Sequence, residues 1–159
     1  GGMESMLSTV ALIMCALAFG GVMETTGMLS AIARAILQRA KRQGSLVAST
    51  VLTCIGMNII APDQYLAIVV PGRMYREAYQ GAGLKMKNLS RALEDGGTLS
   101  SALVPWNTCG AYMWATLGVH PFAYLPFAFL NLLNPMISIL LGYTGWTMEK
   151  EKDFSVAGD

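Results

Sequence analysis

The sequence consists largely of long apolar stretches that are interrupted by polar and helix-breaking residues. The first run, 6–23, would rise about 27 Å as an α-helix, close to the roughly 30 Å of a bilayer's hydrocarbon core. Hydrophobic residues make up 53% of the chain and charged residues only 13%. Soluble domains carry roughly a quarter charged residues, so these charges are too few to cover a soluble surface. The sequence therefore predicts an all-α membrane protein.

We expect five membrane-associated elements and a tail, with about three transmembrane helices, one of them broken. Residues 28–43 place apolar side chains at helical spacing opposite basic ones, which is typical of an amphipathic helix lying in the interface. The remaining elements, in chain order, are a span at 5–23, a re-entrant helical hairpin at 45–72, a broken span at 98–119, a span at 121–146 and a charged tail at 148–159.

The hairpin follows from a polar interruption inside an apolar stretch. Residues 61–64 read Ala-Pro-Asp-Gln, and the apolar residues after them end at Pro71-Gly72. One straight span would hold this polar run against lipid, and the second arm is too short for two full spans. Non-helical backbone at such depth is tolerated only where it is buried in protein or lines a cavity. A hairpin that enters and leaves on the same side satisfies these constraints.

The basic residues favour the same topology. Four lie at 34–42, five at 73–91 and two at 150–152. Lys and Arg tend to remain on the cytoplasmic side of a membrane. A re-entrant hairpin puts all three clusters on that side, whereas a single crossing would separate the first two. We therefore expect a multi-pass protein of the cytoplasmic membrane.

The hairpin tip and the break at 105–110 have similar expected depths. A helix from Ser45 to Asn58 rises about 20 Å and one from Thr98 to Asn107 about 13 Å, against a half-thickness of about 15 Å. Two interrupted elements at matching depth are typical of the binding site of a transporter.

Polar side chains at the two breaks are candidates for binding an ion. Asp63 is the only carboxylate within an apolar stretch, which suggests function because burying it is costly; alternatively it only caps the helix that begins at Gln64. Asn58 and Gln64, with Asn107 and Thr108 at the other break, offer neutral oxygens suited to a small cation. Asn107 and Thr108 alternatively satisfy only their own kinked helix. The helix N-terminus at the hairpin tip would instead favour an anion.

Other polar residues do not indicate an enzyme. Cys15, Cys54 and Cys109 lack metal-site spacing and read as free, buried thiols, and His120 has no carboxylate nearby, so neither a metal-ligand set nor a nucleophile–base pair is present. Asp95, before two glycines, reads as a loop or cap residue. The net charge of +1 gives no indication of nucleic-acid binding. We expect the lipid bilayer as the environment and no cofactor.

Several motifs resemble the NhaC family of bacterial sodium/proton antiporters, in the ion transporter superfamily. They are PDQY at 62–65 after Asn58, PGRMY at 71–75, the spaced residues LSR, ED and GT within 89–98, and PWNTCG at 105–110. The resemblance runs over nearly the whole chain and covers the C-terminal part of a protein about three times longer. It implies one half of an inverted-repeat transporter that moves Na⁺ against H⁺. The start at Gly1-Gly2, without a signal peptide, also suggests a fragment.

The resemblance implies that Asp63 binds either a proton or Na⁺ and that this competition couples the two ions. Related carboxylate carriers bind sodium at Ser-Asn-Thr-like motifs, where this chain has Trp106 before Asn107. The family also includes exchangers of Na⁺ and H⁺-coupled malate and lactate, so an organic anion is an alternative substrate. A membrane interaction protein without transport is a further alternative. The missing N-terminal repeat, or a second copy of the chain, is the expected partner.

Overall fold

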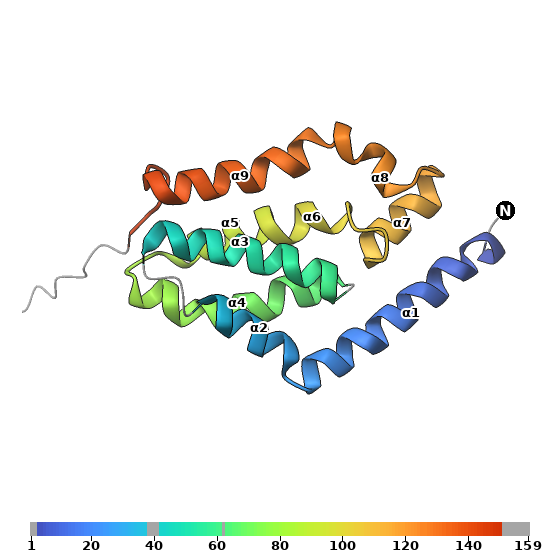
Figure 1. The fold of residues 1–159 in the computed structure, drawn as a ribbon, viewed down its shortest axis with the longest axis horizontal. Coiled ribbons are helices and arrows are strands. Elements are labelled where there is room, and N and C mark those ends of the chain that lie inside the picture. Colours follow the sequence, from blue (N-terminus) through green and yellow to red (C-terminus); the bar gives the residue numbers. More distant parts are fainter. Residues whose placement is uncertain (1–2, 38–41, 62, 151–159) are drawn as a thin grey trace, which may run out of the picture.

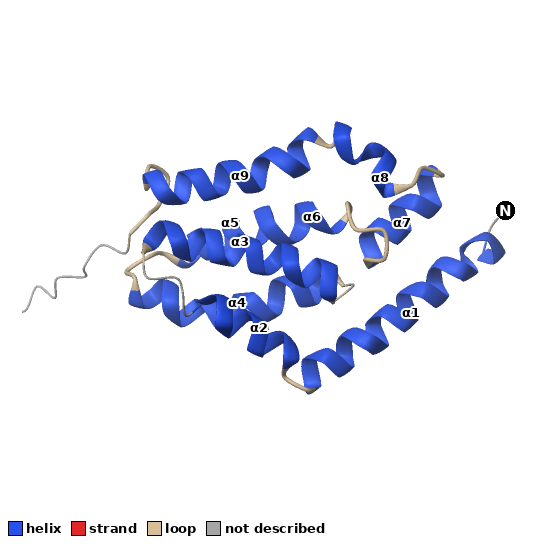
Figure 2. Cartoon of the chain, viewed as in Figure 1, coloured by secondary structure: helices blue, strands red, loops and turns tan. Residues whose placement is uncertain are grey.

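The structure, a computed structural model, describes residues 3–37, 42–61 and 63–150, and their regular secondary structure is helical apart from an isolated bridge between Leu84 and Lys150 (Figure 2). Figure 1 shows α3 in the middle of the molecule, between α9 and α4, with α1 extending from the bundle. The helices are α1 (Met3–Thr25), α2 (Met28–Leu37), α3 (Gln43–Ile60), α4 (Gln64–Gly81), α5 (Met86–Leu93), the π turn η1 (Glu94–Thr98), α6 (Leu99–Ser101), α7 (Thr108–Leu117), α8 (Pro121–Tyr124), the 3₁₀ turn η2 (Leu125–Phe127) and α9 (Phe129–Thr144).

Helices α3 and α4 form an antiparallel hairpin. Buried hydroxyl pairs join their arms: Thr53 bonds to Tyr75 at 2.8 Å, and Thr50 bonds to Tyr79 at 3.2 Å. The later residue of α3 pairs with the earlier residue of α4, as an antiparallel pair requires. Pro62, at the tip, lies outside the residues that the structure describes.

The second arm of the hairpin is longer than the sequence predicts. The break at 71–72 was expected to end it, but α4 continues through Pro71 to Gly81. Proline removes one intrahelical hydrogen bond, yet its fixed φ remains compatible with a helix. Tyr75 and Tyr79, which bond α4 to α3, lie beyond the proline, so tertiary packing stabilises the helix on its far side.

Helix α1, at 23 residues, covers the whole length of the predicted span 5–23. In the described ranges, α3 is the one helix that is long and apolar enough to cross a membrane by length and composition. The predicted span 121–146 is bent by 61° between residues 121–127 and α9, and counts as a second span only if the bent pair is taken together. Of the predicted interfacial helix 28–43, the structure describes α2, which runs to Leu37, and residues 38–41 lie outside the described part.

The broken span begins upstream of the predicted residue 98. The backbone stays helical from Met86 to Ser101, through α5, η1 and α6, before it leaves helical geometry. Gly96 and Gly97 do not break this helix. Their missing side chains instead allow the helix to approach the hairpin closely. A Cβ on Gly96 would lie 2.8 Å from the Val51 carbonyl oxygen, and one on Gly97 would lie 2.8 Å from Ile68 Cγ1.

The charged residues after α9 fold back onto the start of α5. The sequence predicts a tail from residue 148, but the Asn88 side chain donates to the Glu149 carbonyl at 2.7 Å and accepts from the Glu149 N–H at 3.3 Å. Lys87 and Lys85 also bond to the Glu149 carboxylate, and these bonds hold its pKa below the usual range. Glu149 therefore stays ionised at neutral pH, and these pairs weaken only as the pH falls through the lowered pKa. Residues 151–159 lie outside the description.

The break after α6 depends on a glycine. Gly110, in the first turn of α7, packs so closely that a Cβ would overlap the Val104 carbonyl. We expect Gly110→Ala to destabilise the protein by about 1–3 kcal/mol, measured by thermal unfolding in detergent, because this backbone cannot yield. Gly56→Ala in α3, where no atom lies within 4 Å of the new Cβ, is the matched control and should be neutral or stabilising by about 0.5–1 kcal/mol. Equal effects of the two substitutions would contradict this packing.

Asn88 on α5 is expected to hold the segment around Glu149 in place. Asn88→Ala removes both hydrogen bonds to the Glu149 backbone, each with a net contribution of about 0.5–1.5 kcal/mol. We expect amide hydrogen exchange at Glu149 to accelerate about tenfold or more. Ser90→Ala, at an exposed position of the same helix, should leave the rate unchanged. An unchanged rate in Asn88→Ala would mean that the segment is held by other contacts.

Candidate ion-binding site

The hairpin tip and the break between α6 and α7 lie against each other. The Asn107 side-chain nitrogen donates to the Asn58 side-chain oxygen at 3.0 Å, and both residues are fully buried. Beside this pair, the indole N–H of Trp106 donates to the carbonyl of Ile59 at 2.8 Å. The structure therefore brings together the two interruptions that the sequence places at similar depth.

Asn58 also joins these breaks to the helix that precedes α7. Its side-chain nitrogen donates to the carbonyl of Gly97 at 2.6 Å and to the hydroxyl of Ser100 at 2.8 Å. The amide has two N–H donors, so both are used within the protein. Asn58 thus holds the end of α3, the π turn and the break in one arrangement.

A second set of contacts crosses the same junction. The Thr108 hydroxyl donates to Asp63 Oδ1 at 3.4 Å. The side-chain oxygen of Gln64 accepts from the Cys109 thiol at 2.8 Å and lies 3.1 Å from the Ser101 hydroxyl oxygen. All five side chains predicted from the sequence therefore lie at this junction: Asn58 with Asn107, Asp63 with Thr108, and Gln64 with Cys109 and Ser101.

The capping role that the sequence allows for Asp63 is present. Asp63 is the N-cap of α4 and accepts from the Tyr65 N–H at 3.4 Å, while Asn107 is the N-cap of α7 and accepts from the Cys109 N–H at 3.1 Å. Helices α3 and α6 end at this junction, and α4 and α7 begin there. Carbonyl ends of helices favour cations and N-termini favour anions, so the junction offers both kinds of field.

Asp63 has more unused acceptor capacity than its neighbours. Its side chain is half-buried, and its two contacts, both at 3.4 Å, are long and go to the same oxygen. An ionised carboxylate has about four lone-pair positions. The oxygens of Asn58, Asn107 and Gln64 accept shorter hydrogen bonds. Asp63 is therefore the group at this junction with the most acceptor positions free for a cation.

Three participants were not predicted as site residues. Ser100 and Ser101 form a polar pair directly before the break, and this position in an apolar stretch is a signal that could have identified them. The three cysteines interpreted from the sequence as free, buried thiols are free, but only Cys54 is buried: Cys15 is exposed, and Cys109 is partly buried and contacts Gln64. In the described ranges, no group of three or more His, Cys, Asp or Glu residues is placed to hold a metal ion.

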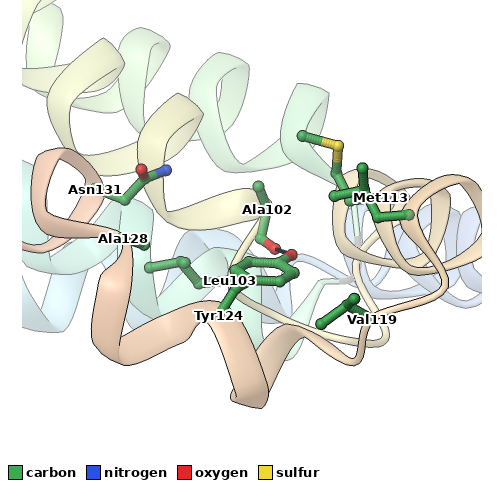
Figure 3. Close-up of a pocket in the computed structure, with 8 residues that line it drawn as sticks. Ala102, Leu103, Met113, Val119, Tyr124, Ala128 and Asn131 are labelled. Carbon is green, nitrogen blue, oxygen red and sulfur yellow. Dashed lines mark hydrogen bonds between the residues drawn. The ribbon is translucent and has the colours of Figure 1, made fainter.

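An apolar pocket of about 410 Å³ lies beside the break and near α9 (Figure 3). Its polar members are Tyr124, whose hydroxyl donates to the Ala102 carbonyl, and Asn131. No charged side chain lines it, so nothing there would compensate an ion. The lining residues are Ala102, Leu103, Met113, Leu117, Val119, Tyr124, Ala128 and Asn131. The junction around Asp63, rather than this pocket, has the chemistry of an ion site.

Known proteins similar to this chain are antiporters. The chain is 44% identical to the Na⁺/H⁺ antiporter NhaC of Bacillus subtilis, over 90% of this chain and 32% of that protein. It is 39% identical to the Na⁺/H⁺ antiporter NhaC of Alkalihalophilus pseudofirmus, over 98% of this chain and 34% of that protein. The malate-2H⁺/Na⁺-lactate antiporter of Bacillus subtilis is 34% identical, over 91% of this chain and 31% of that protein.

The chain spans about a third of the length of the curated relatives it matches. No solved structure matches it. The model of the Na⁺/H⁺ antiporter family matches residues 1–146, which include both breaks and every candidate site residue. The chain therefore belongs to the Na⁺/H⁺ antiporter family.

Proposed function

We propose that this chain supplies an ion site to a secondary active transporter that exchanges Na⁺ for H⁺ across the cytoplasmic membrane. The observation that carries the proposal is that two interrupted elements meet at Asp63, with Thr108 of the opposite break on its carboxylate. The relatives named as Na⁺/H⁺ antiporters support the choice of ions. Since the chain spans about a third of those relatives, we propose that it acts with an inverted repeat elsewhere in a longer multi-pass transporter, or with a second copy.

The proposed exchange takes place at one carboxylate. Protonated Asp63 releases its proton as Na⁺ binds, and the carboxylate takes a proton back when Na⁺ leaves. An ionised carboxylate without a partner is costly inside the membrane, so in this proposal the site carries one of the two cations at each conformational change. That requirement couples the movement of Na⁺ to the opposite movement of H⁺.

The other four side chains have two kinds of role in this proposal. Thr108 and Gln64 add neutral oxygens beside Asp63, because the first contacts its carboxylate and the second is the next residue along α4. Asn58 and Asn107 bind each other and keep the two breaks together. Each of their side-chain oxygens has two lone pairs, so they also remain available as neutral ligands.

The central test is Asp63→Asn in the complete transporter, reconstituted in vesicles. Asparagine caps helices about as well as aspartate, so α4 should still form, but the amide carries no negative charge and takes up no proton. We expect Na⁺-dependent proton flux to fall to background. Glu77→Gln, at an exposed position of the same helix, should retain the flux. Wild-type flux in Asp63→Asn would exclude Asp63 as the exchanging group.

A second candidate function is the exchange of an organic anion coupled to Na⁺ and H⁺. The observation that favours it is the pair of helix N-termini, of α4 and α7, at the junction, because such ends attract carboxylates. The malate-2H⁺/Na⁺-lactate relative belongs to the same comparison. This second candidate function is tested in the same vesicles, with malate outside and lactate inside. We expect Na⁺-dependent proton flux without either anion; flux that requires both would favour the second candidate.

A further inference from the structure

Asp95 lies inside the helix that leads to the break, rather than in the loop or cap that the sequence suggests. It belongs to the π turn η1, which the Leu99 N–H closes by bonding to the Glu94 carbonyl. A π turn inserts one extra residue into a helix and is frequent at functional sites. The Asp95 side chain is only 14% exposed, whereas the neighbouring Glu94 is exposed and accepts from Thr98.

The Asp95 carboxylate is held from two directions. The side-chain nitrogen of Asn134, on α9, donates to its Oδ1 at 2.5 Å. Its Oδ2 lies 3.8 Å from the Arg91 guanidinium, one helical turn earlier. A buried carboxylate is costly unless such partners compensate it. The charge therefore ties the π turn to α9, a helix that is distant in sequence.

The same turn also contacts the candidate ion site. The carbonyl of Gly97 accepts from Asn58, and the carbonyl of Gly96 accepts from Ser100, which Asn58 also contacts. Helix α9 makes a second contact one turn before Asn134, where Asn131 donates to the Leu99 carbonyl at 2.7 Å. The π turn is thus hydrogen-bonded both to α9 and to Asn58.

We propose that Asp95 is a positioning residue for the exchange reaction: by binding Asn134 and Arg91 it fixes the π turn, and the π turn places Asn58 and the break beside Asp63. This proposal rests on the proposed function, because it assigns Asp95 a part in transport at that site. Asp95 acts through Asn58 and does not bind the transported ion. Loss of its bond to α9 therefore slows the conformational change between ion-loaded states more than it weakens ion binding.

The test is a double-mutant cycle in the complete transporter, reconstituted in vesicles. We expect Asp95→Ala and Asn134→Ala each to lower the maximal exchange rate about tenfold, with the KM for Na⁺ within about twofold of wild type. The double variant should be no slower than the slower single variant, because both remove the same bond. Glu94→Gln, which changes the exposed carboxylate of the same turn, is the matched control and should exchange at close to the wild-type rate.

A reciprocal exchange separates positioning from a purely structural role. Asp95→Asn combined with Asn134→Asp restores a donor and an acceptor at this contact with their places reversed. We expect it to recover most of the maximal rate lost in the alanine variants. These nearly isosteric substitutions also provide the test if the alanine variants fail to fold.

Three results would overturn the proposal. They are alanine effects that multiply in the double variant, an Asp95→Ala variant that behaves like Glu94→Gln, and a reciprocal variant that remains as slow as the alanine variants. A wild-type transporter without Na⁺-dependent proton flux would instead contradict the proposed function. The cycle is then measured with the ion that the transporter does move, and the same non-additivity is expected.

Discussion

The broken helix depends on side-chain donors for the carbonyls that its unwinding leaves free. The last carbonyls of a helix have no intrahelical partner, and inside a bilayer no water replaces it. Here each carbonyl from residue 96 to residue 102 accepts a hydrogen bond from a donor within the described chain. The donors, in order, are Ser100 Oγ, Asn58 Nδ2, Ser101 Oγ, Asn131 Nδ2, Leu103 N, Val104 N and the Tyr124 hydroxyl. The end of α6 is therefore held by α3, α8 and α9, in addition to its own residues.

This arrangement links the position of the helices to the geometry at Asp63. Asn58 donates to the carbonyl of Gly97 and accepts from Asn107, so it cannot satisfy both unless the hairpin and the break keep their distance. A shift of the broken helix would have to exchange several of these bonds together, because an unpaired buried polar group is costly. Such a set of bonds favours discrete arrangements over continuous deformation. The proposed exchange needs such discrete states in order to open its site to one side of the membrane at a time.

The local features of the site could be predicted from the sequence, and the contacts around it could not. The positions of Asp63 and Asn107 at the candidate site could be predicted because polar residues beside helix breaks stand out in an apolar stretch. Gly96 and Gly97 misled the prediction, since two glycines after two acidic residues resemble a linker. Their missing side chains instead allow α3 and α4 to approach the π turn, and only the folded arrangement shows this. The predicted end of the hairpin at Pro71 was wrong for a similar reason, because tertiary contacts beyond the proline maintain α4.

The hairpin places charged residues at one end of the bundle, away from the breaks. The buried cluster that includes Leu46, Tyr79, Leu84 and Leu89 joins the start of α3, the end of α4 and the start of α5. The tip of the hairpin and the break at 102–107 lie at the opposite ends of these helices, where Asn58 meets Asn107. Lys85 and Lys87, with their partner on the segment after α9, therefore share an end with the opening of the hairpin. The prediction that the basic clusters share one side of the membrane is compatible with arms longer than a half-membrane, because it depends on the hairpin returning and not on how deep its tip reaches.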